Sequence, residues 1–395
     1  MKNLDELCEF KNGLWRGKKG PFKPIRILRN TNFSDDGRFN FMDVAMHEVE
    51  IKQLESRALE YGDILLERSG GGPKQPVGRV ALFDIRDDKG EYSFSNFTTR
   101  IRVKDKEELN EKFLWRFLYY FYTNGETAKM QKQTHGIRNL DFSEYKQIKV
   151  PLPNLSEQNR IVDILEKADN LCRKRQEADK LSDKTMRSIF LEMFGDPNNN
   201  FKDIDMKKIN VVTEHCQRRD PTKKPNISFK YVDISGVNGD KGIIETYKEI
   251  KGKDAPSRAR QIIHSNDVII STVRPNLKAT ALVPEFLDDQ ICSTGFCVLR
   301  PTERVNHYYL YAITRMEWFT ALLVSKVRGA SYPAVTDKVI LEIEIPAPVI
   351  SNQKKFADLV QKVEKIKEKQ RESKVELDNL FNSLMHRFFS GGMEN

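Results

Sequence analysis

The sequence contains few cysteines and no long apolar run. Its five cysteines are odd in number and none has the Cys-x-x-Cys spacing of a zinc site or redox motif, so we expect reduced thiols and no disulfide framework. No stretch approaches the roughly 18 consecutive apolar residues of a membrane-spanning helix. The first residues include acids and lack the apolar core of a signal peptide. These absences predict a cytoplasmic protein with no membrane partner.

Motifs for catalysis are also missing. An adenine methyltransferase needs a glycine-rich cofactor loop and an Asn/Asp-Pro-Pro-aromatic motif, whereas the segment 196–199 lacks the second proline and the aromatic residue. No Gly-x-x-x-x-Gly-Lys-Ser/Thr loop is present, so ATP hydrolysis is not expected. A nuclease site at Asp240, Glu249 and Lys251 would rest on a spacing that is common by chance, and the pair His215–Cys216 has no further metal ligands nearby. We expect no catalytic residue, no metal and no cofactor in this chain.

Positive charge is in modest excess. The chain has 66 lysines and arginines against 57 aspartates and glutamates, a net charge of +9. A basic chain associates readily with a polyanion, although net charge concerns association and not fold. The alternative, a soluble basic protein without such a partner, stays open on charge alone.

A long internal repeat is present. The segment that begins at Pro151 recurs 195 positions later at Pro346, without a gap across the following helical stretch. A period of this length is not that of a solenoid, whose units have about 20–50 residues. It indicates a duplicated module of one globular domain plus one helix. The identical pairs include Pro151/Pro346, Pro153/Pro348, Ser156/Ser351, Gln158/Gln353, Asp163/Asp358, Lys167/Lys362, Lys174/Lys369, Glu177/Glu372, Asp183/Asp378 and Ser188/Ser383.

Each copy of the repeat contains one long helical stretch. The preceding prolines cannot join a helix interior, and Ser156 and Ser351 are good N-caps because their hydroxyls accept bonds from free amides. Apolar residues then recur every three or four positions, as in a coiled-coil seam, until a polar interval at 173–177 or 368–372. We therefore expect the two helices to pair. The expected seam residues are Ile161, Ile164, Leu165, Ala168 and Leu171 in one helix and Phe356, Leu359, Val360, Val363 and Ile366 in the other.

Short β-like runs precede each long helix, together with one helical run at 107–121 in the first copy and 308–323 in the second. The aromatic residues of the first run are expected in the core rather than stacked on bases. We predict an α+β fold, in which two similar mixed α/β domains are joined and spaced by two long helices that form an antiparallel coiled coil with approximate two-fold symmetry. The expected boundaries are 1–155 for the first domain, 156–195 for its spacer helix, 196–350 for the second domain and 351–390 for the second spacer helix.

Polar, basic loops recur at three equivalent places in the two copies: near the domain start, after a buried strand and before the final strand. Their side chains can bond base edges or phosphates, and their glycines permit close approach. Solvated hairpins are the alternative, but recurrence in both copies favours binding. The candidates are Arg16, Lys18, Lys19, Arg68, Ser69, Lys74, Gln75, Gln133, His135, Arg138 and Asn139 in the first domain, and Arg218, Arg219, Lys223, Thr272, Arg274, Asn276, Lys278, Lys326, Arg328, Ser331 and Tyr332 in the second.

With these features the chain resembles the specificity (S) subunit of type I restriction–modification systems. The matching pieces are Gly-Asp-Ile-Leu-Leu-Glu-Arg-Ser-Gly at 62–70, Val-Gly-Arg-Val at 77–80, Pro-Leu-Pro-x-Leu-x-Glu-Gln-x-Arg-Ile at 151–161 and the duplicated helices. The second copy departs from the pattern, with Asn352 in place of Glu157 and Ser-Thr-Val-Arg at 271–274 in place of Glu-Arg-Ser-Gly. The resemblance extends over nearly the whole chain.

The resemblance implies two target recognition domains, each reading one half of a split double-stranded DNA sequence. It also implies that two modification subunits dock on the helices and methylate adenine with S-adenosylmethionine, and that separate restriction subunits supply ATP-driven translocation and cleavage. S-adenosylmethionine, ATP and Mg are then expected on the partners and not on this chain. Two other classes are the alternatives. A catalytic polypeptide with its own site fails for want of motifs, and an architectural coiled-coil or RNA-binding scaffold remains.

Overall fold

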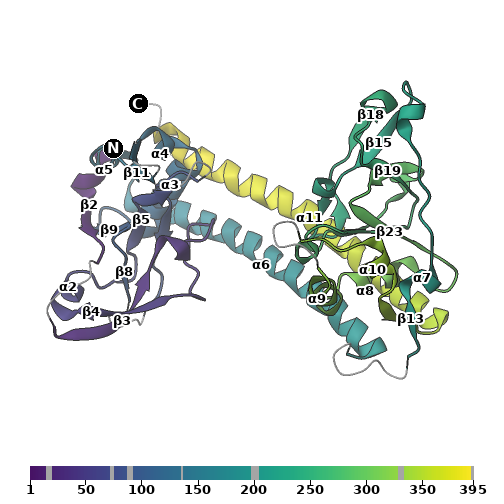
Figure 1. The fold of residues 1–395 in the computed structure, drawn as a ribbon. Coiled ribbons are helices and arrows are strands. Elements are labelled where there is room, and N and C mark those ends of the chain that lie inside the picture. Colours follow the sequence, from purple (N-terminus) through teal and green to yellow (C-terminus); the bar gives the residue numbers. More distant parts are fainter. Residues whose placement is uncertain are drawn as a thin grey trace. The chain divides into compact units, whose positions relative to one another are not determined.

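The computed structural model describes residues 1–14, 20–71, 75–86, 92–134, 137–196, 204–327 and 333–392 (Figure 1). The chain divides into two compact units, Met1–Arg175 with Ser373–Asn395, and Gln176–Glu372. Each unit contains one mixed α/β domain and one half of each long helix, so both helices take part in both units.

The first unit is built on an antiparallel four-stranded sheet in the order β2 (Cys8–Asn12), β9 (Thr98–Val103), β5 (Ile64–Glu67) and β7 (Val80–Leu82). Its smaller sheets are β4 (Ala45–Glu50), β3 (Phe22–Leu28) and β8 (Tyr92–Phe94); β10 (Gln131–Thr134), β11 (Ile137–Leu140) and β6 (Ser69–Gly71); and β1 (Lys2–Asn3) with β12 (Lys149–Val150). The helices of this domain are α1 (Leu4–Leu7), α2 (Ile51–Glu55), α3 (Glu111–Thr123), α4 (Glu126–Lys129) and α5 (Phe142–Lys146).

The second unit repeats the central sheet of the first. The strands β14 (Thr213–Glu214), β23 (Phe296–Pro301), β20 (Val268–Ser271) and β21 (Thr280–Leu282) form the equivalent antiparallel sheet. The other sheets are β18 (Lys248–Lys251), β15 (Ser228–Val232), β22 (Gln290–Ser293) and β19 (Ala259–Ile263); β13 (Met206–Lys208) with β24 (Glu344–Pro346); and β16 (Val237–Asn238) with β17 (Ile243–Ile244). The helices are α7 (Ile209–Val212), α8 (His307–Thr314), α9 (Glu317–Ser325) and α10 (Asp337–Leu341). In both units one parallel strand pair, β3 with β8 or β15 with β22, stands among antiparallel neighbours.

The predicted single helix over 308–323 is wrong, because the structure has two helices there. Helix α8 ends at Thr314, and Met316, whose backbone is extended, is the N-cap of α9. The preceding Arg315 donates to the carbonyl oxygens of Gly239 and Asp240 at 3.0 and 2.9 Å. The apolar periodicity of the segment continues through the interruption between α8 and α9. The sequence pattern therefore did not reveal that the segment forms two helices.

The two long helices, α6 (Leu155–Phe194) and α11 (Ile350–Phe389), have 40 residues each. In the first unit, Ile161 and Leu165 near the start of α6 share a core with Met385 and Phe389 near the end of α11. In the second unit, Phe194 at the end of α6 packs on Phe356 near the start of α11, with ring centroids 5.4 Å apart. This order confirms the predicted antiparallel pairing.

Part of the predicted seam is wrong. Leu171 and Ile366 are 50% and 51% exposed, and Leu359 is 36% exposed. At 3.6 residues per turn, a residue ten positions beyond Ile161 or Phe356 lies roughly 80° round the helix from it. These three residues therefore lie outside the buried seam, on a solvent-facing side of their helices.

Each domain packs on the helix pair through aromatic residues. In the first unit the rings of Phe113 and Phe117 on α3 lie 5.4 and 5.8 Å from that of Phe389. In the second unit Tyr309 on α8 lies 5.0 Å from Phe194, which is the residue equivalent to Phe389 in the repeat. Apart from Tyr122, which is half-buried, the aromatic residues of α3 are thus part of the core or packed against it, as predicted.

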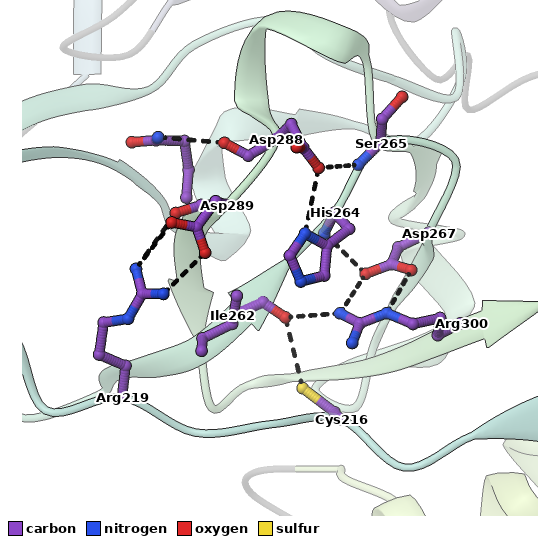
Figure 2. Close-up of polar contacts among 10 residues, drawn as sticks. Cys216, Arg219, Ile262, His264, Ser265, Asp267, Asp288, Asp289 and Arg300 are labelled. Atoms are coloured by element: carbon purple, nitrogen blue, oxygen red, sulfur yellow. Dashed lines mark hydrogen bonds and ion pairs between the residues drawn. The ribbon is translucent and has the colours of Figure 1, made fainter.

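Both domains also contain the same buried ion pair. Asp63 accepts from the guanidinium of Arg102 at 2.6 and 2.7 Å, and Asp267 accepts from Arg300 at 3.1 and 2.9 Å (Figure 2). Each aspartate is only 1% exposed and also accepts from a backbone amide three residues earlier. The bond to Asp267 raises the pKa of Arg300. The pair fixes the turn that leads into the central strand, β5 or β20.

We expect Asp267→Ala to lower the free energy of unfolding of the second domain by about 3 kcal/mol, because the partly buried Arg300 loses its carboxylate. Urea unfolding followed by circular dichroism measures this. Asp289→Ala is the matched control, since Asp289 pairs with Arg219 in an exposed position and such pairs contribute only about 0–1 kcal/mol. Equal losses in the two variants would contradict the structural role of Asp267.

Candidate nucleic-acid interface

Two of the predicted loops of the first domain form one small sheet. The strand β6 follows β5 after Arg68 and pairs with β11, with Ser69 opposite Asn139 and Gly71 opposite Arg138. The Ser69 hydroxyl donates to Oδ1 of Asn139 at 2.6 Å. Residues from two loops that are far apart in sequence therefore act as one surface.

Arg68 immediately precedes β6, and two neighbouring side chains hold its guanidinium. Its Nη1 donates to Oδ1 of Asn12 at 2.8 Å, and its guanidinium carbon lies 4.2 Å from the ring centroid of Phe142. Burial lowers the pKa of Arg68, although the group stays charged at neutral pH. The stacking on Phe142 and the bond to Asn12 fix the guanidinium, which reduces the entropy lost when it binds a partner.

A third loop begins beside the same arginine. Asn12 ends β2, and two residues later Leu14 donates its amide to the carbonyl of Phe94 at 2.9 Å. The chain thus enters the segment 15–19 from the edge where Arg68 lies. Arg16, Lys18, Lys19, Lys74 and His135 lie outside the described residues, as does the side chain of Gln133 in β10; Gln75 is exposed.

The sheet is supported by an ion pair that the sequence did not indicate. Glu67, which is 2% exposed, accepts from two nitrogens of Arg79 at 2.9 Å each. Arg79 also donates to the carbonyl of Asn30 at 3.0 Å, and the Asn30 amide donates to Glu67. At Gly70 the backbone φ is +106°, and a Cβ there would lie 2.8 Å from the Asn30 amide nitrogen. Only glycine suits this position, next to Arg68 and Ser69.

The second domain has the same pairing in shorter form. After β20, Val273 bridges Ala334, the Arg274 amide donates to the carbonyl of Pro333 at 2.8 Å, and the Val335 amide donates to that of Thr272 at 2.9 Å. The loop after the central strand therefore meets the segment before the final strand in both copies.

The candidates of this second loop differ in accessibility. Thr272 is 8% exposed and its hydroxyl donates to the carbonyl of Gly295, so its polar atom is used inside the domain. Arg274 and Lys278 are exposed and have positive φ values of 49° and 52°, on either side of a short 3-10 turn that presents Asn276. Lys326 is exposed after α9. Arg328, Ser331 and Tyr332 lie outside the described residues.

The remaining candidates lie beside β19. Arg218 bridges Gln261, and Arg219 donates to both carboxylate oxygens of Asp289 at 3.2 and 2.7 Å (Figure 2). Arg219 would have to exchange Asp289 for a phosphate, whereas Lys223 is exposed in the turn Pro221–Lys223. Gly252 packs under the carbonyls of Pro221 and Lys224, which places the 252–254 turn next to this loop. These residues form a basic edge of the second domain.

Within the described part of the chain, no three or more His, Cys, Asp or Glu side chains are grouped so that they could hold a metal ion. Among the same residues, no helix combines the length and apolar character needed to cross a membrane.

Comparison with known proteins identifies the family. A model described as the type I restriction modification DNA specificity domain matches residues 1–181 and 202–377. These matches cover most of the chain, so it belongs to the family of type I restriction–modification DNA specificity proteins, which confirms the predicted resemblance. The double match also reproduces the internal repeat.

Individual relatives agree. The chain is 21% identical over 319 residues to the type I restriction enzyme MjaVIII specificity subunit of Methanocaldococcus jannaschii, covering 74% of this chain and 73% of that protein. It matches the HsdS subunit of Thermoanaerobacter tengcongensis at 46% identity over 43% of each chain, with a TM-score of 0.38. The type I S subunit from M. genitalium is 14% identical and covers 97% of this chain and 94% of its own, with a TM-score of 0.55, which supports the fold.

Proposed function

We propose that this chain reads a bipartite sequence in duplex DNA, one half with each domain, and that it is the non-catalytic specificity subunit of a modification and restriction complex. The observation that carries the proposal is the repeated pairing of two polar loops, β6 with β11 in one domain and 272–274 with 333–335 in the other. Each copy thus has its own surface of Arg, Lys and amide side chains, the groups that read base edges and phosphates.

The long helices act as spacer and docking frame in this proposal. Ile164, Lys167, Leu171 and Lys174 follow a three–four spacing on α6, and the equivalent residues of α11 repeat this order. We name these two sets the docking stripes; the second consists of Leu359, Lys362, Ile366 and Lys369. Their four lysines are exposed, as are Leu171, Leu359 and Ile366. One stripe belongs to each compact unit, which suits two identical partners.

The partners are then two modification subunits, each laying an apolar helix with acidic flanks on one stripe. Restriction subunits join through the complex. S-adenosylmethionine, ATP and Mg belong to these partners in the proposal. A methylation assay on the isolated chain should give no product, whereas a chain with its own catalytic site would methylate DNA alone.

We expect Arg68→Ala to relax base preference within one half-site of the target by about 1–3 kcal/mol, because an ordered guanidinium is lost from the reading surface. Removing Lys18 and Lys19 is the matched comparison and should weaken binding to all duplexes alike, since lysines chiefly contact phosphates. Binding of the complete complex to a panel of duplexes with single base changes measures both. Equal binding of an RNA duplex of the same length would favour the scaffold alternative and contradict the proposal.

We expect Leu171→Glu to remove one modification subunit from the complex, and the double variant Leu171→Glu with Ile366→Glu to remove both. Placing a carboxylate in the centre of an apolar contact costs roughly 2 kcal/mol or more of binding free energy. Native mass spectrometry of the reconstituted complex counts the subunits. Val375→Glu is the control, because Val375 is 60% exposed on α11 but corresponds to Lys180 in the repeat. A double variant that still binds two modification subunits would exclude the docking stripes.

A further inference from the structure

Gln158, near the start of α6, is fully buried and ties that helix to its domain. Its Oε1 accepts from the Asn110 amide at 2.9 Å, and its Nε2 donates to the carbonyls of Glu108 and Pro153 at 2.9 Å each. Asn110 is the N-cap of α3, and its own side chain accepts from the amides of Lys112 and Phe113. One side chain thus joins the proline turn before α6, the loop after β9 and the first turn of α3.

Gln353 makes the same three bonds in the second unit. Its Oε1 accepts from the Asn306 amide at 2.8 Å, and its Nε2 donates to the carbonyls of Arg304 and Pro348 at 3.2 and 2.7 Å. Asn306 is the N-cap of α8, and Gln353 is also fully buried. The identity of Gln158 and Gln353 in the repeat therefore has a geometric cause that is the same in both units.

These bonds differ in kind from the packing around them. Apolar contacts between a domain and a helix are non-directional and tolerate small rotations, whereas three hydrogen bonds to one amide require a defined geometry. All three partners are backbone groups, so they persist whatever side chains the domain carries. The contact thus holds the domain at one angle to its helix while the reading loops remain free to vary.

We propose that Gln158 and Gln353 are positioning residues that set the angle of each reading domain on its helix, and through it the number of unread base pairs between the half-sites. This inference rests on the proposed bipartite reading. Neither glutamine lies in a reading loop, and both are buried, so their action on DNA is indirect.

The two domains differ in how much else supports this angle. In the first unit Asp169 of α6 accepts from Arg38 and Arg116 at 2.7 and 2.9 Å, and Glu166 pairs with Lys112. In the second unit the residues equivalent to Lys112, Arg116, Glu166 and Asp169 are Tyr308, Ala312, Gln361 and Glu364. Glu364 pairs with Lys367 and Arg371 of its own helix. One exposed ion pair, Arg187 with Glu317 at 3.5 Å, joins a long helix to the second domain, and such exposed pairs contribute little. Gln353 therefore has weaker ionic support beside it than Gln158.

The test uses the complete complex and duplexes that carry both half-sites with the spacer shortened or lengthened by one base pair. Gln353→Glu keeps the size of the side chain and can accept from the Asn306 amide, but its carboxylate cannot donate to the two carbonyls. We expect it to reduce the discrimination against a wrong spacer about tenfold, equal to about 1.4 kcal/mol. Gln158→Glu should have a smaller effect, because the ion pairs of Asp169 remain.

The matched control is Gln261→Glu. Gln261 is 2% exposed and donates to the carbonyls of Ser293 and Phe296 at 2.9 and 2.6 Å, so these bonds of its side chain lie within the second domain. Its replacement should lower stability and leave spacer discrimination unchanged. Discrimination is a ratio measured on one preparation, so any loss of folded protein cancels. If Gln353→Glu does not fold, Gln353→Met provides the same ratio.

The outcomes are distinct. A wild-type complex that binds every spacer equally would overturn bipartite reading itself. A wild-type complex that discriminates, together with glutamine variants that discriminate equally well, would leave bipartite reading intact and overturn the positioning role. Reduced discrimination in the glutamine variants but not in Gln261→Glu supports the inference.

Discussion

Replacing residues 202–345 by the equivalent segment of a relative is expected to change one half of the methylated DNA sequence completely and to leave the other half unchanged. The reading loops of the second domain pair with one another through Val273 and Ala334, and both loops lie inside the replaced segment. The contacts to the helices include the ring of Tyr309 on Phe194 and the bond from the Asn306 amide to Gln353, within a larger apolar core. A donor with Asn and an aromatic residue at these two places should therefore dock on the retained helices.

Sequencing of methylated adenines in cells that carry the complete system measures this result. The reciprocal exchange of residues 1–150 is the control and should alter only the other half. Changes in both halves after either exchange would show that the domains do not read independently. An unchanged sequence after both exchanges would place base recognition outside this chain.

Inserting four residues into both long helices, after Arg175 and after Glu372, is expected to keep both half-site sequences and to lengthen the spacer between them by one or two base pairs. These are the positions where the chain passes between its compact units. Four residues add about 6 Å of helix and turn it by only about 40°, so the apolar stripes stay nearly in register. Two reading surfaces on one face of the duplex are expected about one helical turn, or roughly 34 Å, apart.

Binding to duplexes with graded spacers detects the change. A two-residue insertion in both helices is the control, because it turns each helix by about 200° and should abolish assembly. An active four-residue variant that still prefers the original spacer would refute the helices as a spacer and leave them only as a docking surface.

The sequence by itself determined the repeat and the long helices. Proline turns and apolar spacing are local signals, so they can be read from the sequence alone. For the same reason the aromatic spacing of α3 predicted its buried face. The family also followed from sequence, since motifs such as that at 151–161 are contiguous. The predicted N-caps Ser156 and Ser351 are wrong. Helix α6 begins at Leu155, after Asn154, whose side-chain oxygen accepts from the Glu157 amide at 2.9 Å, and α11 begins at Ile350, so both serines lie within the first turn of their helices.

Only the tertiary structure decided how distant residues combine. Ser69 meets Asn139 across 70 positions, Asp63 meets Arg102 across 39 and Gln158 meets Asn110 across 48. Such pairings depend on which strands lie side by side, and no local spacing encodes that choice. Local spacing alone also fails to predict which residues of a helix are buried. Leu171 and Ile366 have the expected spacing, but helical rotation and the position of the neighbouring core leave them exposed.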